Sequence, residues 1–339
     1  MKLPIEFTSE EHLEDVMSTP SPMLINSLAQ LEGDIIILGV AGKMGPTLAR
    51  MAKRAAPHKR VIGVARFSNP KLLNSLSTQG IECIQADLLS AQALTALPDV
   101  PNVVFMAGRK FGSQGSEWLT WAMNAHVPAL IAQRYKNSRI VAFSTACVYP
   151  FVNVHGPGAP ESLAPTPPGE YANSCVARER MFEHFSHEHQ TSGCLLRLSY
   201  AIDMRYGVLH DVARTIWQGL PLSVAMGYAN IIWQGDANDL ALRALSTCTT
   251  PTSAINLSGP PISIRDVAIR LAARMGKTVH LTDTEAPSAW LVDCHKANAL
   301  WGPPSVALDT LLDWTAAWVM QGHKSLDKPT HFEVRDGHY

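Results

Sequence analysis

The sequence predicts an α/β protein with a doubly wound parallel sheet and a smaller C-terminal substrate lobe. Apolar segments of strand length recur between residues 34 and 200, and they lack the period-2 alternation of a sheet with one wet face. Helix-like segments separate most of them, which is typical of a parallel sheet covered on both faces. The first apolar segment runs directly into glycines that begin at Gly39. Together these observations indicate a Rossmann-type fold.

The elements follow in order along the chain. The predicted strands cover residues 34–38, 60–65, 81–86, 102–106, 139–143 and 194–198. The predicted helices cover residues 46–56, 90–97 and 118–135, and a further helix precedes the last strand. Ahead of the sheet, Ser9 and Glu10 stand where a first short helix would be capped, and the prolines of residues 19–22 separate it from a second.

Past about residue 200 the alternation becomes irregular, because short glycine- and proline-rich segments interrupt single helices and strands. We therefore expect the chain to divide into several parts. They are an N-terminal helical extension (1–32), a Rossmann domain (33–200, with 230–258 returning to it), a substrate-binding lobe (201–229 and 259–325) and a C-terminal arm (326–339).

The composition restricts the partners. The 339 residues are 46% hydrophobic and 17% charged, and Lys plus Arg (28) nearly cancel Asp plus Glu (29). Such a surface offers no long-range attraction to nucleic acid or anionic lipid, so we expect a small-molecule ligand. The six cysteines form no CxxC pair, the N-terminus lacks a basic and apolar leader, and no apolar run approaches the roughly 18 residues of a membrane span. We predict a cytoplasmic protein with reduced thiols and no membrane partner.

The segment from Gly39 to Gly45 carries the most specific local signal. Gly39, Gly42 and Gly45 have the spacing G-x-x-G-x-x-G between a predicted strand and a predicted helix. Residues without a Cβ permit a tight turn, a close approach of backbone to diphosphate, and close packing of helix on strand. The helix start behind them presents free N–H groups to phosphates. We predict that this loop, with Lys43 and Met44, binds the diphosphate of a nicotinamide dinucleotide.

The end of the second strand bears on the choice of cofactor. Arg66 follows this strand, and no carboxylate stands nearby to accept a hydrogen bond from a ribose 2′-hydroxyl. A cation here favours a 2′-phosphate, so we expect NAD(P), with NADP slightly favoured over NAD. Arg66 as a surface residue stacked over adenine is the alternative. Asp87 and Leu88, after the third strand, are placed to meet the adenine edge, although Asp87 is equally suited to capping the next helix.

With these motifs in order, the chain resembles the extended short-chain dehydrogenase/reductase family, in its NAD(P)-dependent epimerase/dehydratase group, from about residue 34 to residue 318. The likeness is carried by the glycine loop, Asp87-Leu88, Ala107-Gly108, Asn124, and residues 144–149 (STACVY), 171–175 (YANSC), 197–200 (RLSY) and 256–259 (NLSG). The resemblance implies that Ala107, Gly108, Asn124 and Ser199 contribute to the cofactor site. It also implies a homodimer, because pairing of two long helices into a four-helix interface is common in that family.

The same resemblance implies two catalytic residues. In the family, a Ser or Thr four residues before the Tyr of the VYG segment holds the reacting oxygen of the substrate. This position is Thr145, with Pro150 in place of the usual Gly. The tyrosine of the family's Y-x-x-x-K motif corresponds to Tyr171, which would exchange a proton with that oxygen while hydride moves at carbon. Without the resemblance, Thr145 would be interpreted as a strand-end hydroxyl bonded to its own backbone, and Tyr171 as a half-buried helix aromatic.

The lysine of that motif is absent, because position 175 is Cys175. The family's lysine binds the nicotinamide ribose and lowers the tyrosine pKa, and a thiol supplies no such positive charge. Three explanations remain open: Arg178, on the same helical face, substitutes for the lysine; neutral Tyr171 acts as proton donor in carbonyl reduction; or the protein binds its cofactor without turnover. Cys175 itself is expected to be a small buried residue rather than a nucleophile.

Other candidate residues carry less information. Arg109, Lys110 and Phe111 follow the fourth strand, at the edge where ligands of this fold bind, and they suit either an anionic group of a substrate or a solvated loop. The histidines of residues 184–189 complete no ligand motif, so we expect a solvated helix end and no metal. The sequence contains neither a G-x-S-x-G elbow nor a phosphate-binding G-x-x-x-x-G-K-[ST] loop.

Together, these observations and the resemblance predict an NAD(P)-dependent enzyme that acts on a sugar, sugar acid or nucleotide sugar. Hydride transfer at a carbinol carbon is the expected step, either as a dehydrogenation or as one stage of an epimerisation or dehydration. A sensor or regulatory protein of the same fold, which binds the cofactor without catalysis, is the alternative.

Overall fold

The computed structural model describes residues 3–110, 112 and 115–337. A seven-stranded sheet organises the molecule, with every neighbouring pair of strands parallel and the order β11-β7-β5-β4-β1-β2-β3. Its strands are β1 (Ile35–Leu38), β2 (Val61–Ala65), β3 (Glu82–Gln85), β4 (Asn102–Phe105), β5 (Arg139–Thr145), β7 (Gly193–Leu198) and β11 (Ser253–Leu257). The chain builds outward from β1 to β3 and then returns to place β4 on the other side of β1. This reversal of strand order is where a fold of this type binds its ligand.

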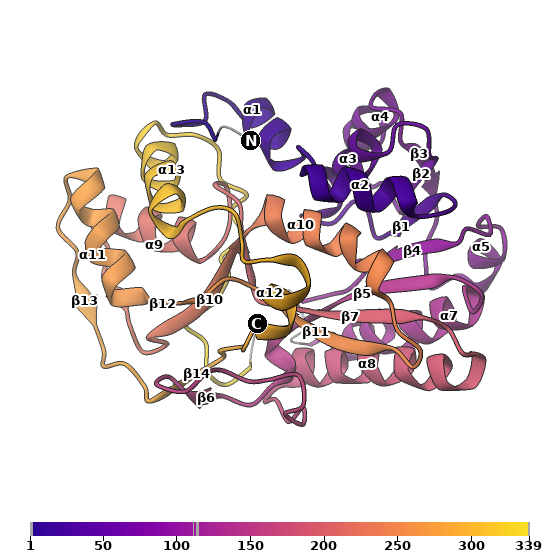
Figure 1. The fold of residues 1–339 in the computed structure, drawn as a ribbon. Coiled ribbons are helices and arrows are strands. Elements are labelled where there is room, and N and C mark those ends of the chain that lie inside the picture. The colour runs from indigo at the N-terminus through magenta and orange to yellow at the C-terminus, as the bar shows by residue number, and fades with distance from the viewer. Residues whose placement is uncertain (1–2, 111, 113–114, 338–339) are drawn as a thin grey trace.

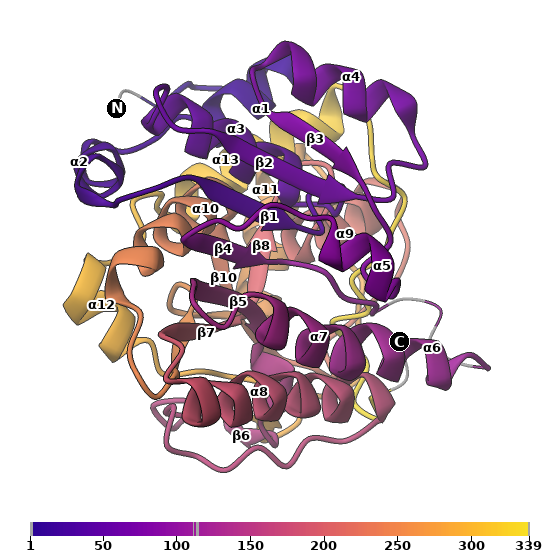
Figure 2. The same ribbon diagram turned by 90° about the vertical axis from the view of Figure 1, so that its right-hand side faces the viewer.

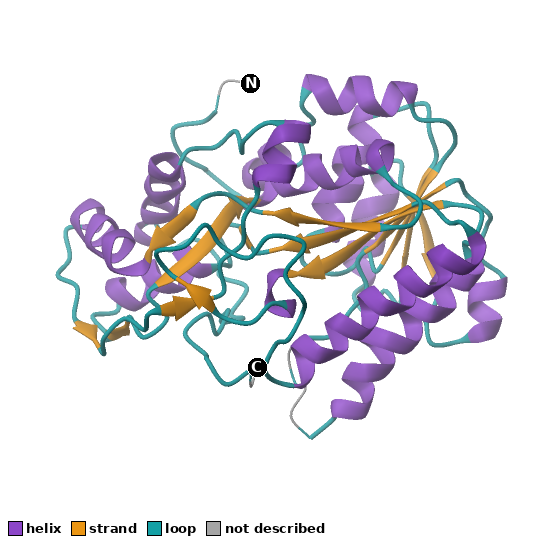
Figure 3. Ribbon diagram, turned by 60° about the horizontal axis from the view of Figure 1, so that its bottom comes forward, coloured by secondary structure: helices purple, strands orange, loops and turns teal. Residues whose placement is uncertain are grey.

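Helices cover both faces of the sheet, as Figures 2 and 3 show. The side chains of β1 alternate between two cores. Ile35 and Ile37 pack in the core under α2, α3 and α10, whereas Ile36 and Leu38 pack in the core under α5, α7 and α8. The bounds of these helices are α2 (Pro22–Gln30), α3 (Gly45–Ala55), α5 (Ala91–Thr95), α7 (Val127–Arg134), α8 (Glu170–His189) and α10 (Gln234–Arg243). The predicted fold class is confirmed.

The predicted strands lie within two residues of the observed ones. The predicted helix over residues 118–135 consists of α6 (Glu117–Trp121), a π-helical turn η1 (Ala122–His126) and α7. Two elements were not predicted from the sequence: α4 (Pro70–Thr78) and β11 as a seventh strand. Asn69 caps the N-terminus of α4, because its side chain accepts from the N–H of Lys71 at 3.0 Å. Residues 230–258 were expected to return to the Rossmann domain. Of the strands in this range, β11 joins the main sheet, whereas β10 (Tyr228–Trp233) belongs to a separate small sheet.

A second core lies beside the carboxyl ends of the main strands, on the left of Figure 1. A small sheet in the order β12-β10-β8 packs there with three helices. These elements are β8 (Tyr200–Ile202), β10 (Tyr228–Trp233), β12 (Pro261–Ser263), α9 (Val208–Trp217), α11 (Ile264–Met275) and α13 (Leu308–Met320). The short elements that complete the fold are β6 (Val152–Asn153), β9 (Leu222–Ser223), β13 (Leu281–Thr282), β14 (Ser288–Ala289), α12 (His295–Trp301), η2 (Ala146–Val148) and η3 (Ala244–Thr247).

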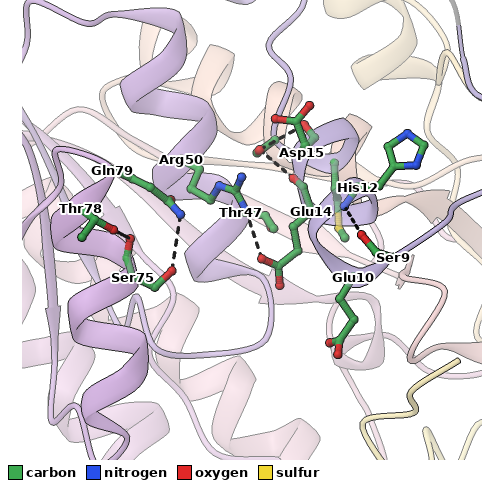
Figure 4. Close-up of polar contacts among 12 residues, drawn as sticks. Ser9, Glu10, His12, Glu14, Asp15, Thr47, Arg50, Ser75, Thr78 and Gln79 are labelled. Carbon is green, nitrogen blue, oxygen red and sulfur yellow. Dashed lines mark hydrogen bonds and ion pairs between the residues drawn. The ribbon is translucent and has the colours of Figure 1, made fainter.

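The two N-terminal helices join different cores. Leu13 and Met17 of α1 (Glu10–Met17) pack in the second core, while α2 packs against the sheet. Ser9 caps α1 by accepting from the N–H of His12 at 3.1 Å, and Glu14 pairs with Arg50 of α3 at 3.1 Å (Figure 4). The N-terminal segment therefore ties the sheet to the second core.

The C-terminal segment docks on its own chain. Thr330 donates through its N–H and its hydroxyl to the carboxylate of Asp211 on α9, at 2.8 and 2.6 Å. Arg335 donates to Ser288 and lies 4.4 Å from the centre of the Phe151 ring. Across the described ranges, no helix is both long and apolar enough to cross a membrane.

Candidate functional site

The glycine loop follows β1 and turns sharply into α3. Gly39 has φ +92°, and a Cβ on it would lie 2.6 Å from the backbone N of Ala107. Gly45 packs so closely on the carbonyl of Val40 that a side chain there would clash with it. The loop thus uses two of its glycines for the reasons predicted, a tight turn and close packing of helix on strand.

The start of α3 leaves donors for an anion. Met44 occupies the N-cap position and makes no side-chain hydrogen bond to the first turn of the helix. Pro46 is at the start of the helix and has no N–H to satisfy. The uncapped amides and the positive end of the helix dipole favour a phosphate at this place.

Two neighbouring cavities open on either side of this loop. The inner cavity has a volume of about 310 Å³ and the outer cavity about 270 Å³, and they share Gly39, Gly42 and Met106. The inner cavity is lined by Gly39, Gly42, Lys43, Met44, Gly45, Met106, Lys110, Phe143, Ser144, Thr145, Ala146, Cys147, Tyr171, Leu198, Ser199, Tyr200, Ala201, Tyr206 and Trp290. The outer cavity is lined by Gly39, Ala41, Gly42, Ala65, Arg66, Phe67, Ser68, Ala86, Asp87, Leu88, Met106, Ala107, Gly108 and Met123. This arrangement fits a dinucleotide, with a base and a ribose on each side of a diphosphate held by the loop.

The outer cavity contains the residues predicted for the adenosine end. Arg66 is exposed there, and its backbone carbonyl accepts from the Gln85 side chain at 2.9 Å. Asp87 also lines this cavity, but its carboxylate accepts from the N–H of Leu89 at 3.0 Å. Asp87 therefore shapes the turn after β3 as well as bordering the cavity.

The inner cavity brings Thr145 and Tyr171 together, at the end of β5 and in the first turn of α8. The hydroxyl of Thr145 accepts from the N–H of Cys147 at 3.2 Å, so it also caps the short helix η2. The pKa of Tyr171 is raised well above its ordinary value, chiefly by burial and then by the neighbouring Cys175 and Cys147. Tyr171 is therefore a neutral phenol at neutral pH, which makes it a proton donor.

Cys175 lies one turn beyond Tyr171 and is fully buried among apolar side chains, including Val148 and Val292. Burial raises the pKa of its thiol above the ordinary value. A protonated, inaccessible thiol is neither a nucleophile nor a cation. The expectation of a small buried residue at this position agrees with its surroundings.

Arg178 lines neither cavity. Its buried guanidinium donates to the backbone carbonyl of Phe143 at 2.8 Å and to the side-chain oxygen of Asn124 at 2.7 Å. Asn124 in turn accepts from the N–H of Arg109 and donates to its carbonyl, each at 2.8 Å. Both residues, predicted to contact the cofactor or reacting groups, lie behind the cavities and hold the loop that follows β4.

That loop supplies one of two lysines in the inner cavity. The Nζ atom of Lys110 lies 5.9 Å from the centre of the Tyr171 ring. The Nζ atom of Lys43 lies 4.1 Å from the centre of the Tyr206 ring and donates to the carbonyl of Ala201 at 2.9 Å. Arg109 turns away, donating to Gly112 and Ser116, and Phe111 falls outside the described residues.

Several residues of the resembled motifs form a buried polar network behind Thr145. Arg197 of β7 pairs with Glu179 of α8 at 2.6 Å and donates to the hydroxyl of Tyr149 at 2.6 Å. Tyr149 donates to Asn256 of β11 at 2.8 Å, and Glu179 also accepts from Ser144 of β5. This network fixes the end of β5 against α8, which sets the relative placement of Thr145 and Tyr171. The motifs contained Ser144, Tyr149, Arg197 and Asn256 but not Glu179, and only the fold shows that these residues are joined.

The structure places most of the predicted site residues on the two cavities. On the inner one are Thr145, Tyr171, Ser199, Lys43, Met44 and Gly45; on the outer one are Arg66, Asp87, Leu88, Ala107 and Gly108; and Gly39 and Gly42 border both. Tyr206 and Trp290, which also line the inner cavity, were not predicted as site residues, and Tyr200 was named only as part of the RLSY motif. No motif marks Tyr206 or Trp290, because each comes from a segment far along the chain from the glycine loop.

The fold and the glycine loop define a Rossmann-type protein of the extended dehydrogenase architecture. A family model described as the NAD dependent epimerase/dehydratase family matches residues 35–216, which is more than half of the chain. The chain therefore belongs to the NAD-dependent epimerase/dehydratase family. No curated protein matches it significantly in sequence.

Solved structures of epimerases and dehydratases share the fold. UDP-glucuronic acid 4-epimerase from Bacillus cereus, in complex with UDP-glucuronic acid and NAD, superposes with a TM-score of 0.70 at 20% identity, covering 86% of this chain and 100% of its own. dTDP-glucose 4,6-dehydratase from Bacillus anthracis, in complex with NAD, gives 0.73 at 15% identity (86% and 97%). Thermus thermophilus UDP-glucose 4-epimerase with NAD gives 0.69 at 17% (84% and 98%). At these identities the similarity shows the fold alone.

Proposed function

We propose that this protein is an NAD(P)-dependent oxidoreductase, epimerase or dehydratase that acts on a sugar, sugar acid or nucleotide sugar at a carbinol carbon. The observation that carries the proposal is the meeting of Thr145 and Tyr171 in a cavity that is continuous with the glycine loop. Family membership and the UDP-glucuronic acid bound by one structural neighbour support it. The described residues fit the cofactor, because the loop is a cradle that a Cβ would fill and the start of α3 offers uncapped amides.

Different residues would bind the diphosphate, the adenosine and the nicotinamide end of the cofactor. Gly39, Gly42 and the backbone from Lys43 to Gly45 would hold the diphosphate. Arg66, Asp87, Leu88, Ala107 and Gly108 would border the adenosine, and Ser199 would border the nicotinamide end. Arg66 favours NADP, whereas the neighbours named above carry NAD, so both nucleotides are candidates.

The nicotinamide, when bound, accepts or supplies the hydride. Thr145 would donate its hydroxyl hydrogen to the reacting oxygen of the substrate and so orient it. Tyr171 would give its proton to that oxygen as a carbonyl becomes an alcohol, which is the direction that suits a neutral phenol. Oxidation would require the same proton to return to a tyrosinate that burial disfavours.

A direct experiment compares the wild type with Tyr171→Phe and Thr145→Val on a panel of sugars, sugar acids and nucleotide sugars, with products followed by NMR. We expect Tyr171→Phe to reduce turnover by about 10²–10⁴-fold while nucleotide affinity changes little. Retained turnover in Tyr171→Phe would refute the assignment of Tyr171.

A non-catalytic sensor is the second candidate, and the observation that favours it is Cys175 in place of the motif lysine. A sensor would bind the nucleotide and leave every sugar of the panel unchanged. We further propose a homodimer paired through long helices, and analytical ultracentrifugation tests the pairing.

A further inference from the structure

Two lysines converge on the inner cavity from different elements. Lys43 comes from the glycine loop and Lys110 from the loop after β4, and both line the same space as Tyr171. Among the described residues that line this cavity, none is Asp or Glu. The two ammonium groups thus line the cavity without a carboxylate beside them in the lining, although Asp203, Asp211 and Glu333 act on them from outside it.

The side chain of Lys43 extends away from the place where the loop would hold a diphosphate. Its Nζ atom donates to the carbonyl of Ala201 on β8 and lies over the ring of Tyr206. Its backbone belongs to the cofactor loop, but its charge lies on the side of the cavity that a substrate would occupy. A diphosphate bound by backbone amides leaves this ammonium group unused.

Lys110 lies near the candidate acid Tyr171. Its Nζ atom lies 5.9 Å from the centre of the Tyr171 ring and 3.3 Å from the carbonyl of Thr330, in the C-terminal segment that closes over the second core. Asn124 fixes both the N–H and the carbonyl of the preceding residue, Arg109. The backbone that precedes Lys110 is thus anchored, and the ammonium group lies near the candidate acid.

Desolvation is the cost of such an arrangement. Burial is the largest influence on both lysines: it lowers the pKa of Lys43 to about 8 and lowers the pKa of Lys110 below its usual value. The pKa of Lys43 is also raised by the charges of Asp203 and Asp211 and lowered by those of Arg205 and Lys110. The pKa of Lys110 is raised by four neighbouring groups: Cys147, Cys175, Asp211 and Glu333. An anion bound between the lysines would stabilise their charged forms.

We propose that Lys43 and Lys110 form an anion-binding subsite, and that the substrate carries a carboxylate or phosphate group close to the carbon whose oxygen exchanges a proton with Tyr171. The inference rests on the proposed function and narrows its substrate class. It selects sugar acids or sugar phosphates, in which the anion belongs to the reacting sugar, over neutral sugars. Ion pairing of this group with the two lysines would orient the substrate oxygen toward Thr145 and Tyr171.

The test is calorimetric and uses ligands that differ in one anionic group. UDP-glucuronate is compared with UDP-glucose for the carboxylate, and glucose 6-phosphate with glucose for the phosphate. The titrations use Tyr171→Phe protein, so that no turnover occurs, with and without NAD. We expect the member with the additional anionic group to bind about 10-fold or more tightly than its partner in at least one pair.

Substitution locates the discrimination. Lys43→Met and Lys110→Met should each weaken binding of the ligand with the additional anionic group by about 10- to 100-fold, and binding of the ligand that lacks this group by less than about threefold. Lys43→Arg and Lys110→Arg should recover part of the loss. Lys71→Met removes the same charge from the exposed face of α4 and should change neither affinity. Circular dichroism melting checks that each variant is folded.

A second readout follows the protons. Because the pKa of Lys43 is about 8, binding of an anion at pH 8.5 should take up protons, seen as a dependence of the measured heat on the ionisation enthalpy of the buffer. Lys43→Met should reduce this uptake.

The proposal is overturned if neither anionic ligand binds, if both members of each pair bind alike, or if the lysine variants lose NAD affinity in place of anion affinity. A preference for UDP-glucuronate assigns the subsite to a carboxylate, and a preference for glucose 6-phosphate to a phosphate. Failure of the proposed function is separate, since it shows as absent nucleotide binding or absent turnover in the wild type while anion discrimination persists.

Discussion

The ammonium group of Lys110 lies 5.9 Å from the ring centre of Tyr171, whereas position 175, one helical turn beyond that tyrosine, holds a buried thiol. Lys110, which lines the inner cavity beside the candidate acid, comes from the loop after β4, whereas Arg178 of α8 lowers the pKa of Tyr171 from outside the cavity lining. Arg178, the cation that the helical spacing favoured, is bonded to Phe143 and Asn124 behind the cavity. The cavity still offers Tyr171 a cation despite the departure from the Y-x-x-x-K motif.

The pH dependence of turnover tests the ionisation of Tyr171. An ordinary tyrosine has a pKa of about 10. Burial and the neighbouring cysteines raise the pKa of Tyr171 above that value, so its neutral phenol persists to higher pH. Carbonyl reduction, which uses the phenol, should be independent of the Tyr171 ionisation up to about pH 9. Oxidation, which uses the phenolate, should accelerate about tenfold per pH unit from pH 7 to 9. An oxidation rate that levels off near pH 7 would show that the pKa is low.

Cys175→Lys restores the sequence motif but not its surroundings. Cys175 is fully buried in a small apolar cluster, so a lysine there would be overpacked and desolvated. We expect loss of stability by about 2–4 kcal/mol and no gain in turnover, with Cys175→Ala as the control that keeps the cluster small. Denaturant unfolding and steady-state rates measure both effects. A faster, stably folded Cys175→Lys enzyme would mean that the lysine is simply missing.

Arg178→Met separates a positioning role from contact with the cofactor. The substitution removes two hydrogen bonds donated by a buried charged group, so we expect about 3 kcal/mol of lost stability. Nucleotide affinity of the folded protein should fall by less than about fivefold. Unchanged unfolding with a large loss of affinity would instead place the guanidinium on the nicotinamide ribose.

Glu179→Gln probes the network that sets Thr145 against Tyr171. Glu179 is fully buried and pairs with Arg197, whose charge would lose its compensation. Breaking a buried pair in this way costs about 3–5 kcal/mol. Glu188→Gln, on the same helix but half exposed, is the matched control and should cost less than about 1 kcal/mol. Equal unfolding free energies for the two variants would contradict the structural role of the network.

The parts of the fold that local patterns determine were predicted well. The apolar strands and the glycine loop carry their signals within a few residues, so their positions agree with the structure to within two residues. The helix α4 was missed because its face is mostly exposed and only Asn69 and Pro70 mark its start. Helical spacing places Arg178 on the same face as Tyr171, but it does not reveal that β5 and Asn124 cover that part of the face. The position of the Lys43 side chain depends on the second core, which no pattern in the glycine loop encodes.

The central claim is that the glycine loop binds a nicotinamide dinucleotide. Isothermal calorimetry of the purified chain with NAD and with NADP, each titrated separately, tests it most directly. We expect at least one of them to bind with micromolar affinity, and binding to be lost in Gly42→Asp, which places a carboxylate in the phosphate cradle. Absence of binding by both nucleotides at millimolar concentration would contradict the enzyme and the sensor interpretations alike.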